Sequence, residues 1–138
     1  MRLQRGFTLV ELMIVILVIA IIASIAIPTY RSFILRAQRT DATAALLRAR
    51  SAQEKFFLQN RRYMTDADLI AAGLNMSEHG FYTVASAPDG ARPLPNFALT
   101  AVPAAGSPQA SDTKCTNFTL DDVGTRGSTP SPIATCWK

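Results

Sequence analysis

The sequence holds few side chains whose type and spacing could do chemistry. Its only histidine, His79, has no nucleophile motif, metal-ligand spacing or phosphate-binding glycine loop around it, and we expect it in a loop before a strand. The adjacent carboxylates Asp121 and Asp122 lack the spaced oxygen ligands of a calcium loop and are more typical of a turn. We therefore predict no catalytic residue, no metal site and no cofactor, and a protein that is not an enzyme.

The two cysteines, Cys115 and Cys136, are the next candidates for chemistry. Neither lies in a CxxC pair or near His79, which argues against zinc and makes one disulfide the economical interpretation. Two unpaired buried thiols are the alternative. A bridge would place this part of the chain outside the cytoplasm. In the chain-entropy account, closing a loop of this length stabilises the fold by roughly 3 kcal/mol.

Glu11 is unusual because it lies at the start of an apolar segment in which residues 12–27 contain Ser24 as their only polar residue. A carboxylate inside a spanning helix costs a few kcal/mol on insertion scales, so such groups usually have a partner or a function. One interpretation is that Glu11 stays hydrated at the membrane interface. In the other, the chain is cut after Gly6, and the carboxylate pairs with the new amine of Phe7 or of a neighbouring subunit.

The apolar segment itself is long enough to cross a membrane once. Residues 7–27 form a helix of about 30 Å at 1.5 Å per residue, which matches the hydrocarbon thickness of a bilayer. A small residue, Gly6, precedes the segment instead of following it, so the order differs from a secretory signal. Basic residues flank both ends and do not decide the orientation. The predicted disulfide does, and it indicates a cytoplasmic N-terminus and an external C-terminus.

Residues 5–12, Arg-Gly-Phe-Thr-Leu-Val-Glu-Leu, followed by the apolar run, resemble the class III signal of type IV prepilins. These proteins are the subunits of type IV pili and of type II secretion pseudopili. The resemblance implies that a membrane-embedded prepilin peptidase cuts between Gly6 and Phe7 and methylates Phe7. It implies that Glu11 pairs with the amine of a neighbouring subunit during assembly. The implied partners are other pilin subunits, the prepilin peptidase and the pilus assembly machinery.

The helical pattern resumes after Pro28, which we expect to kink or loosen the helix. Residues 34–60 contain neither Gly nor Pro, and small residues recur at alternating spacings of three and four, the pattern of one helix face. This stripe consists of Ala42, Ala45, Ala49, Ala52 and Phe56. We expect it to face the core, with contact to another subunit as the alternative. The other faces carry Arg36, Arg39, Arg50 and Gln53, and we expect the arginines to be solvated.

The rest of the chain predicts a small sheet. Residues 65–68 have the pattern of a capping box and predict a short helix that stops at Gly73. Strands are expected at residues 81–85, 97–102 and 115–120, with a short fourth strand at 135–137. The fold class is therefore α+β, a long helix packed on a small antiparallel sheet. This arrangement agrees with the pilin fold that the resemblance implies.

These observations together predict four segments. Residues 1–6 form a cleaved leader, 7–28 a transmembrane and assembly helix, 29–60 its amphipathic continuation, and 61–138 an extracytoplasmic β-sheet domain with a C-terminal disulfide loop. Before assembly the protein is expected to cross the inner membrane once, and after assembly to lie in an extracellular pilus.

The C-terminal part, residues 114–124 through Cys136 and Trp137, is similar to a subgroup of minor pilins that includes DNA-uptake pilins of competent bacteria. We hypothesise a structural, minor subunit of a type IV pilus that serves adhesion, twitching motility or DNA uptake. A DNA-binding minor pilin acting as a receptor in natural transformation is the first alternative. A type II secretion pseudopilin is the second, although the disulfide is less typical of that group.

DNA binding would need cations for phosphate and aromatic rings for stacking. Trp137 or Tyr82 could stack, while Asp112 and the Asp121–Asp122 pair lie among the cations and weaken the case. A solvated β-domain surface is the alternative interpretation. The candidate phosphate contacts are Arg92, Lys114, Arg126 and Lys138.

Overall fold

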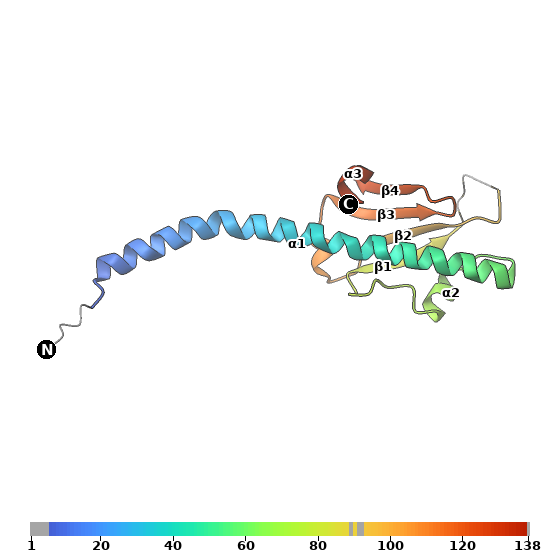
Figure 1. Cartoon of the computed structure of the whole chain (residues 1–138), viewed down its shortest axis with the longest axis horizontal. Helices are drawn as coiled ribbons and strands as arrows, with labels where there is room; N and C mark the ends of the chain where they lie inside the picture. Colours follow the sequence, from blue (N-terminus) through green and yellow to red (C-terminus); the bar gives the residue numbers. More distant parts are fainter. Residues whose placement is uncertain (1–5, 89, 91–92, 138) are drawn as a thin grey trace. The chain divides into compact units, whose positions relative to one another are not determined.

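The computed structural model describes residues 6–88, 90 and 93–137. The chain divides into two compact units, Met1–Ile34 and Leu35–Lys138, which are described separately. Helix α1, Leu9–Asn60, contributes its first half to one unit and its second half to the other (Figure 1).

In the first unit, α1 continues through Pro28 without interruption. The proline has no N–H to donate to the carbonyl of Ser24, so this part of the helix has one hydrogen bond fewer. Hydroxyl groups on this part of the helix donate to backbone carbonyls. Ser24 Oγ lies 2.7 Å from the oxygen of Ile21, and Thr29 Oγ1 lies 2.9 Å from that of Ile25. These bonds keep the few polar side chains of the segment satisfied without water.

The second unit contains a four-stranded antiparallel sheet in which each strand pairs with the next along the chain. The strands are β1 (Tyr82–Ala87), β2 (Ala98–Pro103), β3 (Cys115–Asp121) and β4 (Arg126–Pro130). A short 3₁₀ helix, η1 (Pro108–Ser111), lies between β2 and β3. The first three strands confirm the sequence prediction to within two residues at each end.

Strand β3 contains an irregularity that explains its burial pattern. The register with β4 shifts between Cys115 and Asn117, so that one extra residue stands on β3. Because alternate residues of a regular strand face opposite sides, Cys115 and Phe118 could not both face the core without this shift. Both are fully buried. The bulge therefore lets the cysteine and the aromatic ring share one face.

The predicted fourth strand at residues 135–137 is wrong. The fourth strand is β4, and residues 135–137 belong to and follow a short helix, α3 (Ile133–Cys136), whose N-cap is Pro132. The sequence of β4, Arg-Gly-Ser-Thr-Pro, contains no apolar alternation because its residues are half-buried or exposed at the edge of the sheet. Propensity therefore missed it.

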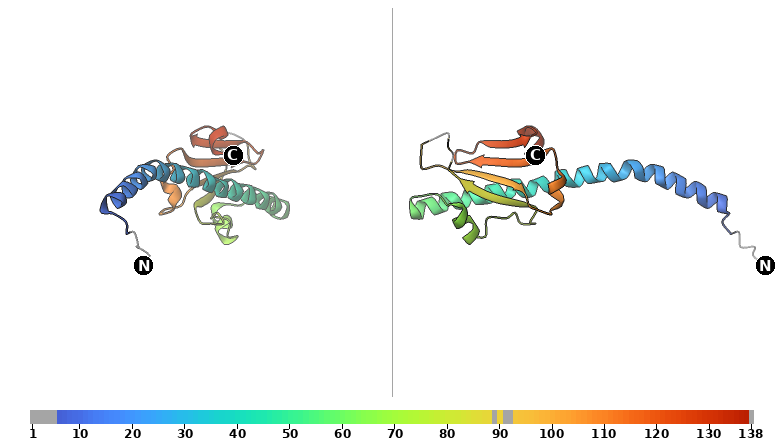
Figure 2. Two further views of the ribbon diagram at one scale, coloured as in Figure 1. Left: turned by 60° about the vertical axis from the view of Figure 1, so that its left-hand side comes forward. Right: turned by 180° about the vertical axis from the view of Figure 1, so that it is seen from behind.

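The second half of α1 lies across one face of the sheet, as the two views in Figure 2 show. Ala42, Ala45 and Ala49 are buried there, as predicted, whereas Ala52 and Phe56 are half-buried. These small side chains leave room for larger ones in the core between the helix and the sheet. The sheet contributes large side chains to the same core, among them Tyr82, Val84, Leu99, Phe118 and Leu120.

Two residues that we placed on the other faces of α1 are buried, and one of them, Arg39, was expected to be solvated. Arg39 is 5% exposed and Gln53 is completely buried. Gln53 is tolerated because its amide is fully used: Nε2 donates to the carbonyl of Met64 and to Ser86 Oγ, and Oε1 accepts the N–H of Met64. The sequence pattern counted apolar positions and therefore could not foresee polar residues with partners on other elements.

The short helix α2 (Asp66–Ala71) begins at the predicted capping box. Thr65 accepts a hydrogen bond from the backbone of Asp68, and the Asp68 carboxylate accepts one from the backbone of Thr65. Asp66 accepts the backbone N–H of Ser86, which belongs to the edge strand β1. The helix therefore covers part of the sheet edge that β1 would otherwise expose.

The burial of Ala45 in the core between α1 and the sheet predicts a matched pair of substitutions. Ala45→Leu should lower the free energy of unfolding by about 1–3 kcal/mol, because three extra carbons have no room at a well-packed contact. Ala44→Leu is the control, since Ala44 is exposed and both substitutions exchange the same residue types on one helix. Chemical denaturation of both variants measures the difference. Equal stabilities would show that the helix does not need a small residue at position 45.

Candidate functional site

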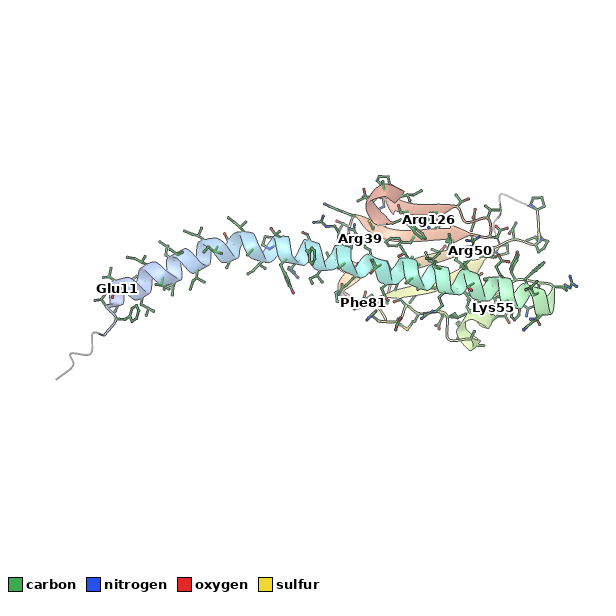
Figure 3. The ribbon with its side chains drawn as sticks, viewed as in Figure 1. Glu11, Arg39, Arg50, Lys55, Phe81 and Arg126 are labelled. Atoms are coloured by element: carbon green, nitrogen blue, oxygen red, sulfur yellow. A yellow bond between two sulfur atoms is a disulfide. The ribbon has the colours of Figure 1, made fainter. Side chains whose placement is uncertain are left out.

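The predicted cleavage site lies just before the first turn of α1. Gly6, Phe7 and Thr8 are outside the helix, and Phe7 is 86% exposed. The backbone N–H and the hydroxyl of Thr8 both donate to Glu11 Oε2 at 2.9 Å, and the N–H of Glu11 donates to Thr8 Oγ1 at 3.2 Å. Thr8 and Glu11 therefore form a capping box. Figure 3 shows Glu11 at the start of the helix.

This capping box gives Glu11 a partner within its own chain. Sequence reasoning considered hydration or a neighbouring amine for the carboxylate and missed Thr8, although the spacing Thr-x-x-Glu is the signal for a capping box. Two hydrogen bonds from Thr8 reduce the cost of placing a carboxylate at the edge of an apolar segment. The same bonds involve one carboxylate oxygen, so the geometry is compatible with a further donor on the other.

The first half of α1 is uncovered in this chain. It is long and apolar enough to cross a membrane, and no residue of its most apolar stretch is buried. A shallow apolar groove of about 700 Å³ lies around Pro28, lined by Ile22, Ile25, Ala26, Thr29, Tyr30 and Phe33. Such a surface requires lipid or another protein to cover it.

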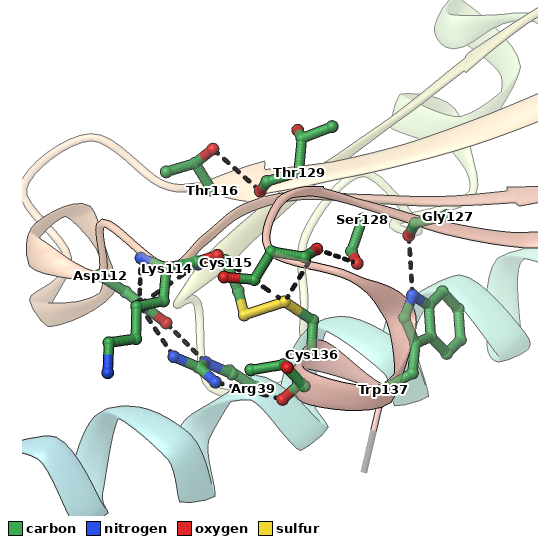
Figure 4. The surroundings of a disulfide bond; sticks show 12 residues. Arg39, Asp112, Lys114, Cys115, Thr116, Gly127, Ser128, Thr129, Cys136 and Trp137 are labelled. Atoms are coloured by element: carbon green, nitrogen blue, oxygen red, sulfur yellow. Dashed lines mark hydrogen bonds and ion pairs between the residues drawn. A yellow bond between two sulfur atoms is a disulfide. The ribbon is translucent and has the colours of Figure 1, made fainter.

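The second unit contains a buried ion pair between Arg39 of α1 and Asp112, which follows η1. Arg39 Nε lies 2.7 Å from Asp112 Oδ2, and Nη2 lies 3.0 Å from Oδ1, so the contact is bidentate (Figure 4). Burial opposes ionisation of Asp112, but hydrogen bonds from Arg39 and from two backbone N–H groups outweigh it and lower its pKa. The pair is therefore charged at neutral pH.

The predicted disulfide between Cys115 and Cys136 is present, and both cysteines are buried. It joins the start of β3 to the end of α3. The next residue, Trp137, donates its indole N–H to the carbonyl of Gly127 at 2.8 Å. The guanidinium carbon of Arg126 lies 5.1 Å from the centre of the Trp137 ring system, which is a cation–π geometry. Disulfide, α3 and the edge strand β4 thus form one connected region.

The four cations proposed for DNA are only partly described. Arg92 and Lys138 lie outside the described residues. Lys114 and Arg126 are both exposed, but Lys114 precedes β3 whereas Arg126 pairs with Leu120, six residues further along. At about 3.3 Å per residue they are about 20 Å apart along the hairpin. They can contact different phosphates of one nucleic acid but not the same one.

Of the two rings proposed for stacking, only Trp137 is partly exposed, and it is half-buried. Tyr82 is completely buried and donates its hydroxyl to Gln109 Oε1 at 2.7 Å, and burial raises its pKa well above the ordinary value. A role for Tyr82 in stacking is therefore wrong. Its position at the start of a strand, with Val84 on the same face, was the signal for burial.

The remaining candidate residues from the sequence are His79, which contacts helix α1, and the Asp121–Asp122 pair. His79 lies in a loop before β1, as expected, with Nδ1 3.0 Å from Asp41 Oδ1 and its ring stacked on Phe81. The hydrogen bond with Asp41 raises the pKa of His79.

Asp121 accepts the backbone N–H of Thr125, which is a turn contact. Within the described residues, no three His, Cys, Asp or Glu side chains gather closely enough to hold a metal ion.

Known proteins share both the N-terminal signal and the body of this chain. Residues 1–27 match the prokaryotic N-terminal methylation motif, and residues 28–119 match the family described as "Type IV minor pilin ComP, DNA uptake sequence receptor". The chain belongs to the type IV minor pilin family. The fold agrees, because this pilin has the long apolar helix and the antiparallel sheet that the sequence predicted.

Curated relatives of this pilin are named as pilins or fimbrial proteins. The type IV major pilin protein PilA of Myxococcus xanthus is 37% identical over 133 residues, which cover 94% of this chain and 57% of that protein. A fimbrial protein of Pseudomonas aeruginosa is 40% identical over 67 residues, covering 49% and 44%. The major pilin PilE of Neisseria gonorrhoeae is 35% identical over 80 residues, covering 58% and 48%. The chain spans about half the length of the curated relatives that it matches.

The buried pair predicts how stability depends on pH. Asp112 has a lowered pKa in the folded pilin, so its contribution is present above the pKa of the unfolded chain and is lost as the pH falls through the folded value. Asp112→Asn should lower the free energy of unfolding at pH 7 by about 3–5 kcal/mol, because it leaves Arg39 buried without a counter-charge. The variant should also lose less stability than the wild type on acidification below about pH 4.

Denaturation at several pH values measures both effects. Glu54→Gln is the control, because Glu54 is an exposed carboxylate on the same helix that carries Arg39. If Asp112→Asn and the wild type lose stability in parallel on acidification, the ion pair does not contribute as described.

Proposed function

We propose that this pilin is a minor subunit of a type IV pilus and that its uncovered apolar helix packs against other pilin subunits in the fibre. The observation that carries the proposal is the entirely exposed apolar half of α1 in a chain whose N-terminus matches the methylation motif. Lipid covers this surface before assembly and neighbouring helices cover it afterwards. In this proposal the subunit crosses the inner membrane with its N-terminus in the cytoplasm, and the buried disulfide supports an external C-terminus.

Processing is the first step of this proposal. Residues 1–6 are the leader, 7–28 the assembly helix, 29–60 its continuation and 61–138 the external domain. A prepilin peptidase cuts between Gly6 and Phe7 and methylates Phe7. Support comes from the exposed, non-helical segment at Gly6–Thr8, because a protease requires its substrate backbone outside a helix. The capping box keeps the helix from extending into this segment.

Glu11 has the second role in assembly. In the fibre, its carboxylate accepts a hydrogen bond from the N-terminal amine of a neighbouring Phe7. Within the described residues, the bonds from Thr8 reach only Oε2 of Glu11, so the amine can bond to Oε1 without breaking the capping box. A charge pair of this kind in a low-dielectric surrounding favours one register between neighbouring helices.

Mass spectrometry of purified pili tests processing and assembly together. The pilin should be present as a chain that starts at methylated Phe7. Glu11→Gln should reduce its amount in the fibre while it still accumulates in the membrane, because the amide keeps an acceptor for Thr8 but loses the charge. Thr83→Ser, a conservative change on the exposed side of β1, is the control. A chain in the fibre that retains Met1, or that starts after Pro28, would contradict the proposed processing.

A second function, DNA binding during uptake, is favoured by one specific observation. The family that matches residues 28–119 is described as a DNA uptake sequence receptor. In this chain, Lys114 and Arg126 offer two exposed cations on the β3–β4 hairpin, and Trp137 offers an aromatic ring beside Arg126. Phosphate contacts would supply most of the affinity, with the ring available for a base.

Duplex binding by the full chain in a non-ionic detergent tests this function. Affinity should fall steeply as salt rises, and Lys114→Gln and Arg126→Gln should each reduce the magnitude of the log–log salt slope by about one. Lys55→Gln is the control, because Lys55 is an exposed lysine on α1, away from the hairpin (Figure 3). No binding at low salt would overturn the DNA function, and equal effects of all three substitutions would place the contacts elsewhere.

A further inference from the structure

Arg39 contacts the protein on both sides of the loop that the disulfide closes. On one side it holds the Asp112 carboxylate, three residues before Cys115. On the other, Nη1 donates to the carbonyl of Thr135 at 3.4 Å, one residue before Cys136. One side chain of α1 thus reaches both ends of a segment that is otherwise joined by the disulfide (Figure 4).

The Asp112 side of this contact fixes the start of β3. Asp112 Oδ1 accepts the backbone N–H of Lys114 at 3.0 Å and that of Cys115 at 3.4 Å, in addition to Nη2 of Arg39. The backbone of Lys114 is therefore held by a carboxylate whose own position depends on the guanidinium. If Arg39 moves, the Asp112 carboxylate loses its counter-charge. The backbone of Lys114 then shifts, and the exposed Lys114 side chain shifts with it.

The contact of Arg39 with Thr135 lies two residues before Trp137. The ring of Trp137 is held by its hydrogen bond to Gly127 and packs edge-on against Phe118, with ring centres 6.3 Å apart. The guanidinium of Arg126 lies over the Trp137 ring, with its carbon 5.1 Å from the ring centre. Trp137 directly follows α3, so the orientation of α3 sets where its ring enters this contact with Arg126, and Thr135 is the residue of α3 that Arg39 contacts.

We propose that Arg39 is a positioning residue that sets the geometry of the C-terminal surface formed by Lys114, Arg126 and Trp137. That this surface binds DNA rests on the proposed DNA function. That Arg39 holds the surface in place does not depend on that function. The fork of a guanidinium bonds both carboxylate oxygens and a third acceptor at once, whereas a lysine ammonium acts as a point charge. The disulfide limits the distance between its two ends, and Arg39 fixes their orientation.

Arg39→Lys tests the proposal in the full chain in non-ionic detergent. The pilin has one tryptophan, so fluorescence emission and acrylamide quenching report on Trp137 alone. In folded protein with the disulfide formed, the variant should show red-shifted emission and stronger quenching. Its duplex affinity should fall, with the magnitude of the salt slope reduced by about one. Arg48→Lys is the matched control, because Arg48 is an exposed arginine of α1 that contacts the carbonyl of Met76.

A role in stability alone predicts a lower unfolding midpoint with unchanged tryptophan signals and unchanged salt slope, and that result would overturn the proposal. If Arg39→Lys does not fold, the double variant Arg39→Met with Asp112→Leu removes both charges at similar volume, a change that other proteins tolerate. Wild-type tryptophan signals in that folded variant would also overturn it. Altered tryptophan signals with no duplex binding by the wild type would support the positioning role and overturn the DNA function.

Discussion

A buried guanidinium must be fully paired, and this requirement connects the parts of the second unit. Arg39 lies on a helix face that packs against the sheet, where an unpaired charge would cost several kcal/mol. Asp112 satisfies it, and the segments that carry Asp112 and Thr135 are thereby held against α1. An apolar pair could fill the same space and give similar stability. What the ion pair adds is a fixed direction, because its bonds are bidentate.

The two halves of α1 meet opposite physical demands. In the second half, small residues such as Ala42 and Ala49 give the helix a face that the sheet covers completely. In the first half, large apolar residues remain exposed on all sides, so this segment is stable only in lipid or against other apolar helices. At the N-terminal start of that half, the capping box of Thr8 and Glu11 satisfies the polar groups.

Much of this architecture could be predicted because it depends on local patterns. The alanine spacing, the capping box at Thr65 and the first three strands each follow from a few neighbouring residues. The buried Arg39 could not be predicted, because its partner Asp112 is 73 residues away and pairing decides whether a charge is buried. Strand β4 was not predicted for a related reason, because its residues pair with β3 but show no apolar alternation of their own. The capping box of Thr8 and Glu11 is different, because its pattern is local and the sequence alone could have predicted it.

In the C-terminal region, a disulfide and an ion pair together hold one surface, and each restricts a different motion. The disulfide joins Cys115 to Cys136, but a single bond of this kind allows the attached segments to rotate about it. Trp137 restricts rotation from the outside through Gly127, and Arg39 restricts it from the core through Thr135. These contacts come from β4 and α1, so the short helix α3 is held between an edge strand and the central helix. A four-residue helix has too few internal hydrogen bonds to keep its own orientation, and its geometry therefore depends on these external contacts.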